Sequence, residues 1–313
     1  MNIKPREFTK ELFNKKTTTL NFEGNTIRCL TLSGRKVTAW ENASLPQDQM
    51  SQGVIHLPEE VSKKVTSLLG KTKAATRNLI TGITDQRSIH RLLSLPAIDE
   101  NLLDETVQRK AKQEFALPID EVDISWQIVK RTQEKLKVYV LAIPKEITDS
   151  QVETLAKANL KPKVMDTKPL ALIRAVNQAN SLIVNLEEYS MAVIIVVDGL
   201  PVIVRTVPLE SGDLTAEAKL DLLSQELART TKFYNESNKE NRLPENTPLY
   251  TTGTMFNFLR LADRLTNSSP LRDRLQERTP YPLQVLKPNL ETPKILPPAE
   301  YAVNIGLALK VLR

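Results

Sequence analysis

The sequence has few of the residues on which several kinds of functional site depend. Its 9 glycines are about 3% of the 313 residues, against about 7% in average proteins. Loops that bind phosphates use glycine because backbone N–H groups must approach the anion closely, often with positive φ. The shortage of glycine therefore argues against a phosphate-binding loop of the usual kind.

Cysteine and histidine are also scarce. The single cysteine, Cys29, cannot form an internal disulfide, and we expect it to be a small buried residue. The two histidines, His56 and His90, have no neighbouring cysteine in the sequence. This composition argues against a zinc site.

The sequence has no long apolar run. The longest, residues 191–197, is far shorter than the roughly 20 residues that a membrane-spanning helix needs, and no signal-peptide pattern follows residues 1–6. We therefore expect a cytoplasmic protein. Aromatic residues make up 5% of the chain and the net charge of +6 is spread along it, so we expect no nucleic-acid partner.

Residues 1–20 are expected to form a basic N-terminal extension. Lys and Arg outnumber Asp and Glu in residues 1–16, where Phe8 and Leu12 are spaced like one face of a helix. The segment fits either a solvated terminus or a weak contact of residues 1–16 with an anionic membrane surface. Both interpretations stay open.

Hydrophobic periodicity predicts two halves with the same order of elements. In the first half we expect strands at residues 26–32, 37–43 and 53–57, a helix at 59–69, a strand at 78–84 and a helix at 168–179. In the second half we expect strands at 181–186, 191–197 and 201–207, a helix at 215–234, a strand at 249–252 and helices at 255–265 and 301–312. Both halves contain the order βββαβα, which few folds repeat.

An insertion interrupts the first half at residues 87–166. Its predicted elements follow the order β-α-β-β-α-β of a ferredoxin-like subdomain and end with a helix at 148–158 and a strand at 162–165. The expected domains are a basic extension (1–20), a first lobe (21–86 with 167–180), the inserted subdomain (87–166) and a second lobe (181–313).

Two βββαβα units that face each other across a cleft are a property of actin-like proteins. We therefore expect an α/β fold of the two-lobed, actin-like (ribonuclease H-like) class. The inserted β-α-β-β-α-β subdomain would be attached to its first lobe.

Short motifs along the chain resemble the PilM family, actin-like cytoplasmic proteins of type IV pilus assembly that are related to FtsA. The motifs are Ser44-Leu45-Pro46 with Gly53-Val54-Ile55, Ser94-Leu95-Pro96, Leu141-Ala142-Ile143-Pro144-Lys145-Glu146, Asp198-Gly199-Leu200-Pro201, Thr252-Gly253 and Ile305-Gly306-Leu307-Ala308-Leu309. Together they follow the family's order over nearly the whole chain after residue 20.

The resemblance implies a site for ATP and magnesium, built from the loops after the first strands of each half and a Gly-Gly step before a late helix. All three loops are altered in this sequence. The first is a tight turn without a carboxylate, the second has an amide and a glutamate in place of the Asp-x-Gly residues, and the third keeps one glycine. The altered positions are Ser33, Gly34, Lys36, Asn185, Glu187, Gly253 and Thr254. We therefore expect no nucleotide cofactor and no bound metal.

We also expect no enzyme activity, ATPase activity included. The sequence has no activated serine or cysteine motif and no pair of carboxylates at a telling spacing. Asp198 precedes Gly199 and is typical of a hairpin turn, whereas His90 lies in a predicted strand without an orienting partner.

The resemblance implies a non-catalytic cytoplasmic scaffold, peripheral to the inner membrane. Its partner would be a PilN-like inner-membrane protein, whose N-terminal cytoplasmic tail would lie in a groove between the first lobe and the inserted subdomain. The sequence does not identify the residues that line this groove.

Three alternatives stay open. One is an ATP-binding switch or ATPase of the same machinery, which the shortage of glycine disfavours. Another is an actin-like platform of type II secretion of the GspL type. The last is an FtsA-like division protein, which the expected end of the chain after its last core helix disfavours, since FtsA-like proteins carry an amphipathic C-terminal helix.

Overall fold

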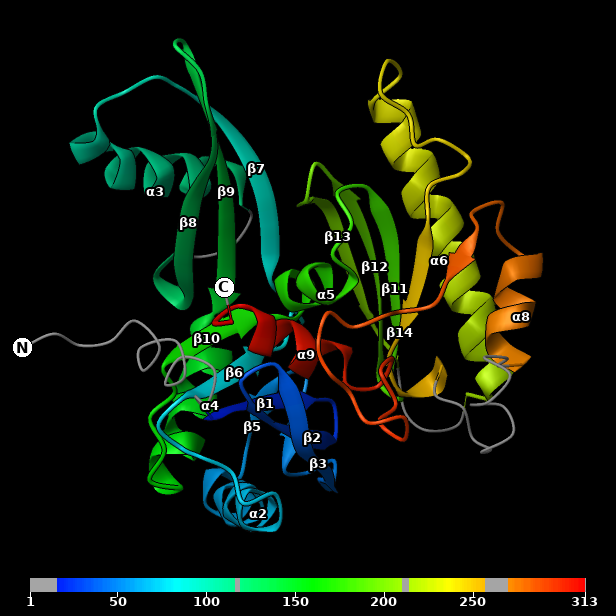
Figure 1. The fold of residues 1–313 in the computed structure, drawn as a ribbon. Coiled ribbons are helices and arrows are strands. Elements are labelled where there is room, and N and C mark those ends of the chain that lie inside the picture. Colours follow the sequence, from blue (N-terminus) through cyan, green and yellow to red (C-terminus); the bar gives the residue numbers. More distant parts are fainter. Residues whose placement is uncertain (1–15, 116–118, 210–213, 257–269, 313) are drawn as a thin grey trace, which may run out of the picture.

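The computed structural model describes residues 16–115, 119–209, 214–256 and 270–312 (Figure 1). Two five-stranded sheets form two lobes that stand side by side, and a three-stranded sheet rises from the first lobe. The basic segment 1–15 and most of the helix expected at 255–265 lie outside the described residues.

The sheet of the first lobe has the strand order β10-β6-β1-β2-β3. Its strands are β1 (Lys16–Glu23), β2 (Thr26–Ser33), β3 (Lys36–Ser44), β6 (Leu79–Ile83) and β10 (Val164–Thr167). Helices α2 (Pro58–Lys71) and α4 (Lys145–Lys157) pack on one face of this sheet, where they bury a cluster that includes Cys29. Cys29 is buried, as expected, and burial raises the pKa of its thiol to about 11.

The central strand β1 corrects the expectation for the start of the chain. Residues 16–20, expected in a basic extension, begin this strand. Its pattern is weak because only Leu20 and Phe22 are apolar, while β-branched threonines fill other buried positions. Residues 53–57, expected as the third strand, contribute only β5 (Val54–Ile55), which pairs with β4 (Met50–Ser51).

The sheet of the second lobe has the order β13-β12-β11-β14-β15. Its strands are β11 (Ser181–Leu186), β12 (Ser190–Val197), β13 (Leu200–Pro208), β14 (Leu249–Thr252) and β15 (Leu283–Gln284). Helices α6 (Ala216–Ser237) and α8 (Pro270–Glu277) lie on its outer face (Figure 1). Asp198 and Gly199 both have positive φ in the turn between β12 and β13, which confirms the predicted hairpin turn.

Two helices between the sheets join the lobes through one core. Helices α5 (Lys168–Val176) and α9 (Ala302–Leu309) pack on each other and on apolar residues of both sheets. Gly306 permits this packing, because a Cβ atom there would lie 1.8 Å from the carbonyl oxygen of Ala171. The lobes are therefore continuous at this core.

The inserted subdomain is smaller than expected. It consists of β7 (Ile89–Pro96), β8 (Val122–Arg131) and β9 (Lys135–Pro144) in the order β7-β9-β8, covered by α3 (Leu103–Glu114). The expectation that a second helix and a fourth strand complete its β-α-β-β-α-β order is wrong. Helix α4 packs on α2, because its Leu155 belongs to the core of the first lobe. Strand β10 pairs with β6, where its Val164 packs against the core between the two sheets. The domain boundaries themselves stay a prediction.

Candidate functional site

The first hairpin turns of the two lobes meet each other. The turn between β1 and β2 contains Gly24, and a Cβ atom at Gly24 would lie 3.5 Å from the Tyr189 side chain in the turn between β11 and β12. The hydroxyl of Ser190 donates a hydrogen bond of 2.9 Å to Glu23 across the same junction. Charged side chains from both lobes are buried beside these turns.

Arg28 of β2 lies at the centre of the first group, which we call the Arg28 cluster. It comprises Arg28, Glu187, Thr254 and Glu300. Both terminal nitrogens of Arg28 donate to the Glu187 carboxylate, at 3.3 and 2.8 Å, and one of them also donates to the Thr254 hydroxyl at 2.8 Å. Its Nε lies 3.7 Å from Glu300. The arginine side chain is only 2% exposed.

Lys168, at the start of α5, lies at the centre of a second group, the Lys168 cluster. Its Nζ lies 3.1 Å from Glu23 and 3.0 Å from Asp85, and its side chain is fully buried. Asp85 also accepts a hydrogen bond from Thr206 of β13. The Lys168 cluster (Lys168, Glu23, Asp85, Ser190 and Thr206) therefore joins the first lobe to two strands of the second lobe.

Burial and the neighbouring charges shift the pKa values of the ionisable groups in both clusters. Burial alone would raise the pKa of Glu187, but Arg28 and the Thr254 hydroxyl hold it below its ordinary value. Burial opposes protonation of Lys168, yet Asp85 and Glu23 keep its pKa above the ordinary value. Burial raises the pKa of Glu23, and the neighbouring carboxylates raise it further against the effect of Lys168.

The clusters do not fit ATP with magnesium. Two cations face four carboxylates, so the formal charge of the two clusters is negative and would repel phosphates. The Lys168 ammonium already lies between Glu23 and Asp85, where a divalent cation would need their oxygens. Among the described residues, no group of three or more His, Cys, Asp or Glu side chains is arranged to hold a metal ion.

The structure brings together four of the residues predicted from sequence. Glu187 and Thr254 belong to the Arg28 cluster, Gly253 precedes Thr254, and Asn185 is buried nearby with its amide donating to Thr252 at 3.2 Å. Gly253 has φ +99°, and a Cβ there would lie 2.4 Å from the carbonyl oxygen of Leu186. Close packing of the backbone therefore requires this glycine.

The other three predicted residues, Ser33, Gly34 and Lys36, lie elsewhere. They form the turn between β2 and β3. Ser33 follows Arg28 by five residues on one strand, which places the turn roughly 16 Å away at about 3.3 Å per residue. The missed strand β1 explains this difference, because without it the turn after β2 is taken for the first turn of the sheet.

Sequence reasoning missed the charged residues that fill the junction. They are Glu23, Arg28, Asp85, Lys168 and Glu300. One signal in the sequence could have indicated them, namely a charged residue among the apolar residues of a strand, such as Arg28 in β2. A charge at such a position must be paired, because its burial alone would be very costly.

His90 is a buried residue, and its surroundings do not favour a role as a general base. Its Nδ1 lies 2.6 Å from the Tyr139 hydroxyl, and burial lowers the pKa of the imidazole to about 4. His90 is therefore neutral at neutral pH. In the described structure it joins its own strand β7 to Tyr139 on the neighbouring strand β9 of the inserted sheet.

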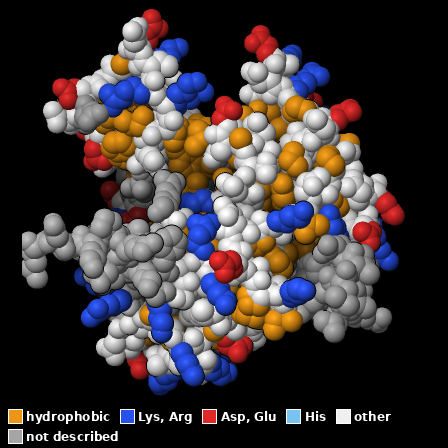
Figure 2. Space-filling view, in the orientation of Figure 1, with side chains coloured by type: hydrophobic (Ala, Val, Ile, Leu, Met, Phe, Trp, Pro, Cys, Tyr) orange, Lys and Arg blue, Asp and Glu red, His pale blue; other side chains and the backbone are white. Residues whose placement is uncertain are grey.

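A groove of about 450 Å³ lies where the inserted sheet meets the first lobe. The inserted sheet contributes Asp123 and Leu141, helix α4 contributes Asp149 and Val152, and β10 contributes Met165. Figure 2 shows hydrophobic side chains gathered over the three-stranded sheet on this side of the molecule. Apolar walls and nearby carboxylates suit an extended chain better than a nucleotide.

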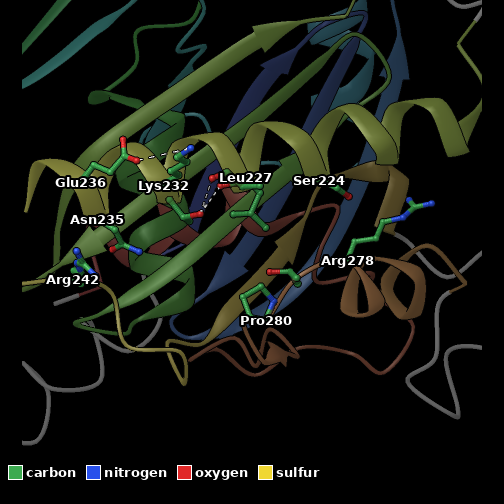
Figure 3. A pocket seen from close by; sticks show the side chains of 11 residues that line it. Ser224, Leu227, Lys232, Asn235, Glu236, Arg242, Arg278 and Pro280 are labelled. Atoms are coloured by element: carbon green, nitrogen blue, oxygen red, sulfur yellow. Dashed lines mark hydrogen bonds and ion pairs between the residues drawn. The ribbon is translucent and has the colours of Figure 1, made fainter. Parts of the chain in front are cut away.

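A second pocket, of about 490 Å³, runs beneath α6 (Figure 3). It is lined by basic residues, but Lys232 lies 3.9 Å from Glu236, and Arg278 pairs with Glu217 and Asp221 at 2.5 and 3.1 Å. These carboxylates offset two of its positive charges. The pocket lies on the outer face of the second lobe, away from both clusters.

Comparison with solved structures shows an actin-like ATPase fold, as expected. A structure of a PilM–PilN type IV pilus biogenesis complex matches with a TM-score of 0.76 and 19% identity, over 96% of this chain and 99% of that chain. The ethanolamine utilization protein EutJ from Carboxydothermus hydrogenoformans matches with a TM-score of 0.53 and 11% identity, over 94% and 89%. At sequence identities this low, the likeness shows only that the folds are similar.

The cytoplasmic domain of EpsL, from the type II secretion system of Vibrio cholerae, matches with a TM-score of 0.49 and 12% identity, over 75% of this chain and 81% of that chain. This likeness is too weak to favour a secretion platform. No helix in the described part of the chain is both long and apolar enough to cross a membrane.

Comparison with protein sequences identifies the family. None of the curated proteins matches this sequence significantly. The model of the type IV pilus assembly protein PilM, however, matches residues 26–206, which is more than half of the chain. The match includes the first lobe from β2 onward, the inserted subdomain and the first strands of the second lobe. The chain therefore belongs to the PilM family of type IV pilus assembly proteins.

Proposed function

We propose that this protein is a non-catalytic scaffold on the cytoplasmic side of the inner membrane that docks the tail of a PilN-like membrane protein. The groove between the inserted sheet and the first lobe carries the proposal. A similar fold is known in a complex of PilM with PilN, which makes a PilN-like tail the natural occupant.

The groove offers backbone as well as side chains to an extended peptide. Strand β8 ends the three-stranded sheet and β10 ends the sheet of the first lobe, and residues of both strands line the groove. An added strand gains main-chain hydrogen bonds at such an edge, while alternate side chains enter pockets between the apolar residues.

The charge of the groove suits a basic tail. Asp123 and Asp149 lie on its rim, and the hydroxyl of Thr148 donates to Asp123 at 2.6 Å. The third carboxylate, Asp166, already pairs with Arg174 and with Lys310. Cytoplasmic segments next to membrane helices are rich in Lys and Arg, so Asp123 and Asp149 would attract such a tail.

The first prediction concerns the apolar wall. Leu141→Glu is expected to weaken binding of a synthetic N-terminal peptide of the cognate PilN-like protein by more than about 10-fold, because the new carboxylate would lose water on docking. Fluorescence anisotropy of the labelled peptide measures this affinity.

Leu102→Glu is the matched control, since Leu102 is 55% exposed and lies outside the groove. It should bind the peptide like the unaltered protein. Equal affinities for all three proteins, each shown to be folded by circular dichroism, would contradict docking in this groove.

The second prediction concerns nucleotide. Millimolar ATP with magnesium is expected to leave the melting temperature unchanged, because the charged clusters fill the junction between the lobes. A ligand at about 100 times its dissociation constant would stabilise the fold by about 2.7 kcal/mol, which thermal denaturation detects readily. A magnesium-dependent increase would favour the alternative of an ATP-binding switch.

A further inference from the structure

We propose that Arg28 is a built-in ligand of this protein, whose guanidinium group holds the two lobes together beside the junction of their first hairpin turns. The inference extends the non-catalytic part of the proposed function. It does not depend on which peptide occupies the groove.

Arg28 belongs to the first lobe, whereas the acidic and hydroxyl groups that its side chain contacts belong to the second lobe. It comes from β2, whereas Glu187 follows β11, Thr254 follows β14 and Glu300 precedes α9. One side chain thus ties three separate segments to the first lobe. A bound ligand in a two-lobed protein acts in the same way, by contacting both lobes at once.

The site around the guanidinium is built for it. Glu187 accepts two parallel hydrogen bonds from Arg28, which is the geometry that guanidinium and carboxylate groups favour. The Thr254 hydroxyl and backbone N–H both donate to Glu187, at 3.3 Å for the N–H, and so orient the carboxylate. These contacts leave the carboxylate directed toward Arg28 from the second lobe.

The Arg28–Glu187 pair is buried, and its burial explains why it would hold the two lobes together. We call this role the lock. Arg28 and Glu187 have side chains only 2% and 7% exposed. Separating the lobes at this junction would leave both charges without a partner, and breaking a buried pair is strongly unfavourable. The lobes are also joined by the apolar core of α5 and α9, so the pair would control opening on the side of the hairpin turns.

Chemical rescue tests the proposal. Arg28→Ala is expected to lower the melting temperature by about 10 °C, and guanidinium chloride at about 20 mM, well below denaturing concentrations, should restore at least half of the loss. Sodium chloride at the same concentration should restore nothing. Arg205→Ala is the matched control, because Arg205 forms a surface pair with Glu226 at 2.6 Å, and it should show neither the loss nor the rescue.

A measurement of the distance between the lobes distinguishes two roles of Arg28, namely holding the lobes together and only stabilising the fold. Spin labels at Lys63→Cys on α2 and Lys232→Cys on α6 report the spacing of the lobes by electron paramagnetic resonance. Arg28→Ala should broaden the distance distribution, and guanidinium should narrow it. If Arg28→Ala does not fold, Arg28→Lys, which keeps the charge but loses the fork of donors, should show a smaller broadening.

Two results would overturn the proposal, and a third would reject only the peptide groove. Loss of stability without rescue and with an unchanged distance distribution would make Arg28 an ordinary buried residue. Narrowing of the distance distribution in the unaltered protein by ATP with magnesium would assign the locking role to nucleotide instead of Arg28. Failure of peptide docking with intact rescue would reject the groove and leave the lock in place.

Discussion

Lys168→Met is expected to lower the free energy of unfolding by about 3–5 kcal/mol. The fully buried ammonium group pairs with both Glu23 and Asp85, and methionine would fill similar space without a charge. Two carboxylates would then stay buried without their cation. Urea denaturation followed by circular dichroism gives the loss directly.

Lys219→Met is the matched control for this variant. Lys219 is also buried, but its Nζ donates to the backbone carbonyl of Glu188 at 2.8 Å instead of lying between carboxylates. We expect a smaller loss of about 1–2 kcal/mol, the cost of one unpaired acceptor. Adding Glu23→Gln and Asp85→Asn to Lys168→Met should recover part of its loss, and equal losses in the two single variants would refute the explanation by charge.

Gly306→Ala is expected to lower the free energy of unfolding by more than about 3 kcal/mol, at the upper end of what overpacking costs. The new methyl group would lie 1.8 Å from the Ala171 carbonyl oxygen, and backbone cannot rotate away as a side chain can. Helices α5 and α9 would have to separate in the core that joins both sheets. Thermal and urea denaturation measure the effect.

Gly70→Ala provides the contrast. Gly70 is also helical, in α2, but a Cβ atom there meets nothing within 4 Å. Alanine should therefore stabilise the protein by about 0.5–1 kcal/mol, through its better helix propensity. Similar effects of the two substitutions would show that helix propensity, and not the close approach of α5 and α9, governs position 306.

Local patterns predicted the elements whose residues carry a strong signal. The apolar strands β11 and β12 and the amphipathic helix α2 lie within a few residues of their expected bounds. Strand β1 was missed, since buried threonines make up much of it and threonine is not read as apolar. The same omission moved the expected first loop from Gly24 to Gly34.

The hydrophobic pattern does not show which strands and charged residues pair. Contacts between segments that are distant in the sequence decide this. Strand β10 has the pattern of any short strand, and only its parallel pairing with β6 assigns it to the first lobe. Arg28, Lys168 and Glu187 are far apart in sequence, and none belongs to a motif that indicates a buried ion pair.

Hydrophobic periodicity and short motifs predict the two-lobed actin-like class and the resemblance to the PilM family, because both are local properties of the chain. The pairing of Glu187 with a cation, and the filling of the junction between the lobes by Arg28 and Lys168, follow from the folded arrangement alone. The reason is that charge pairing depends on which residues the folded chain brings within a few ångströms, and sequence spacing does not contain that distance.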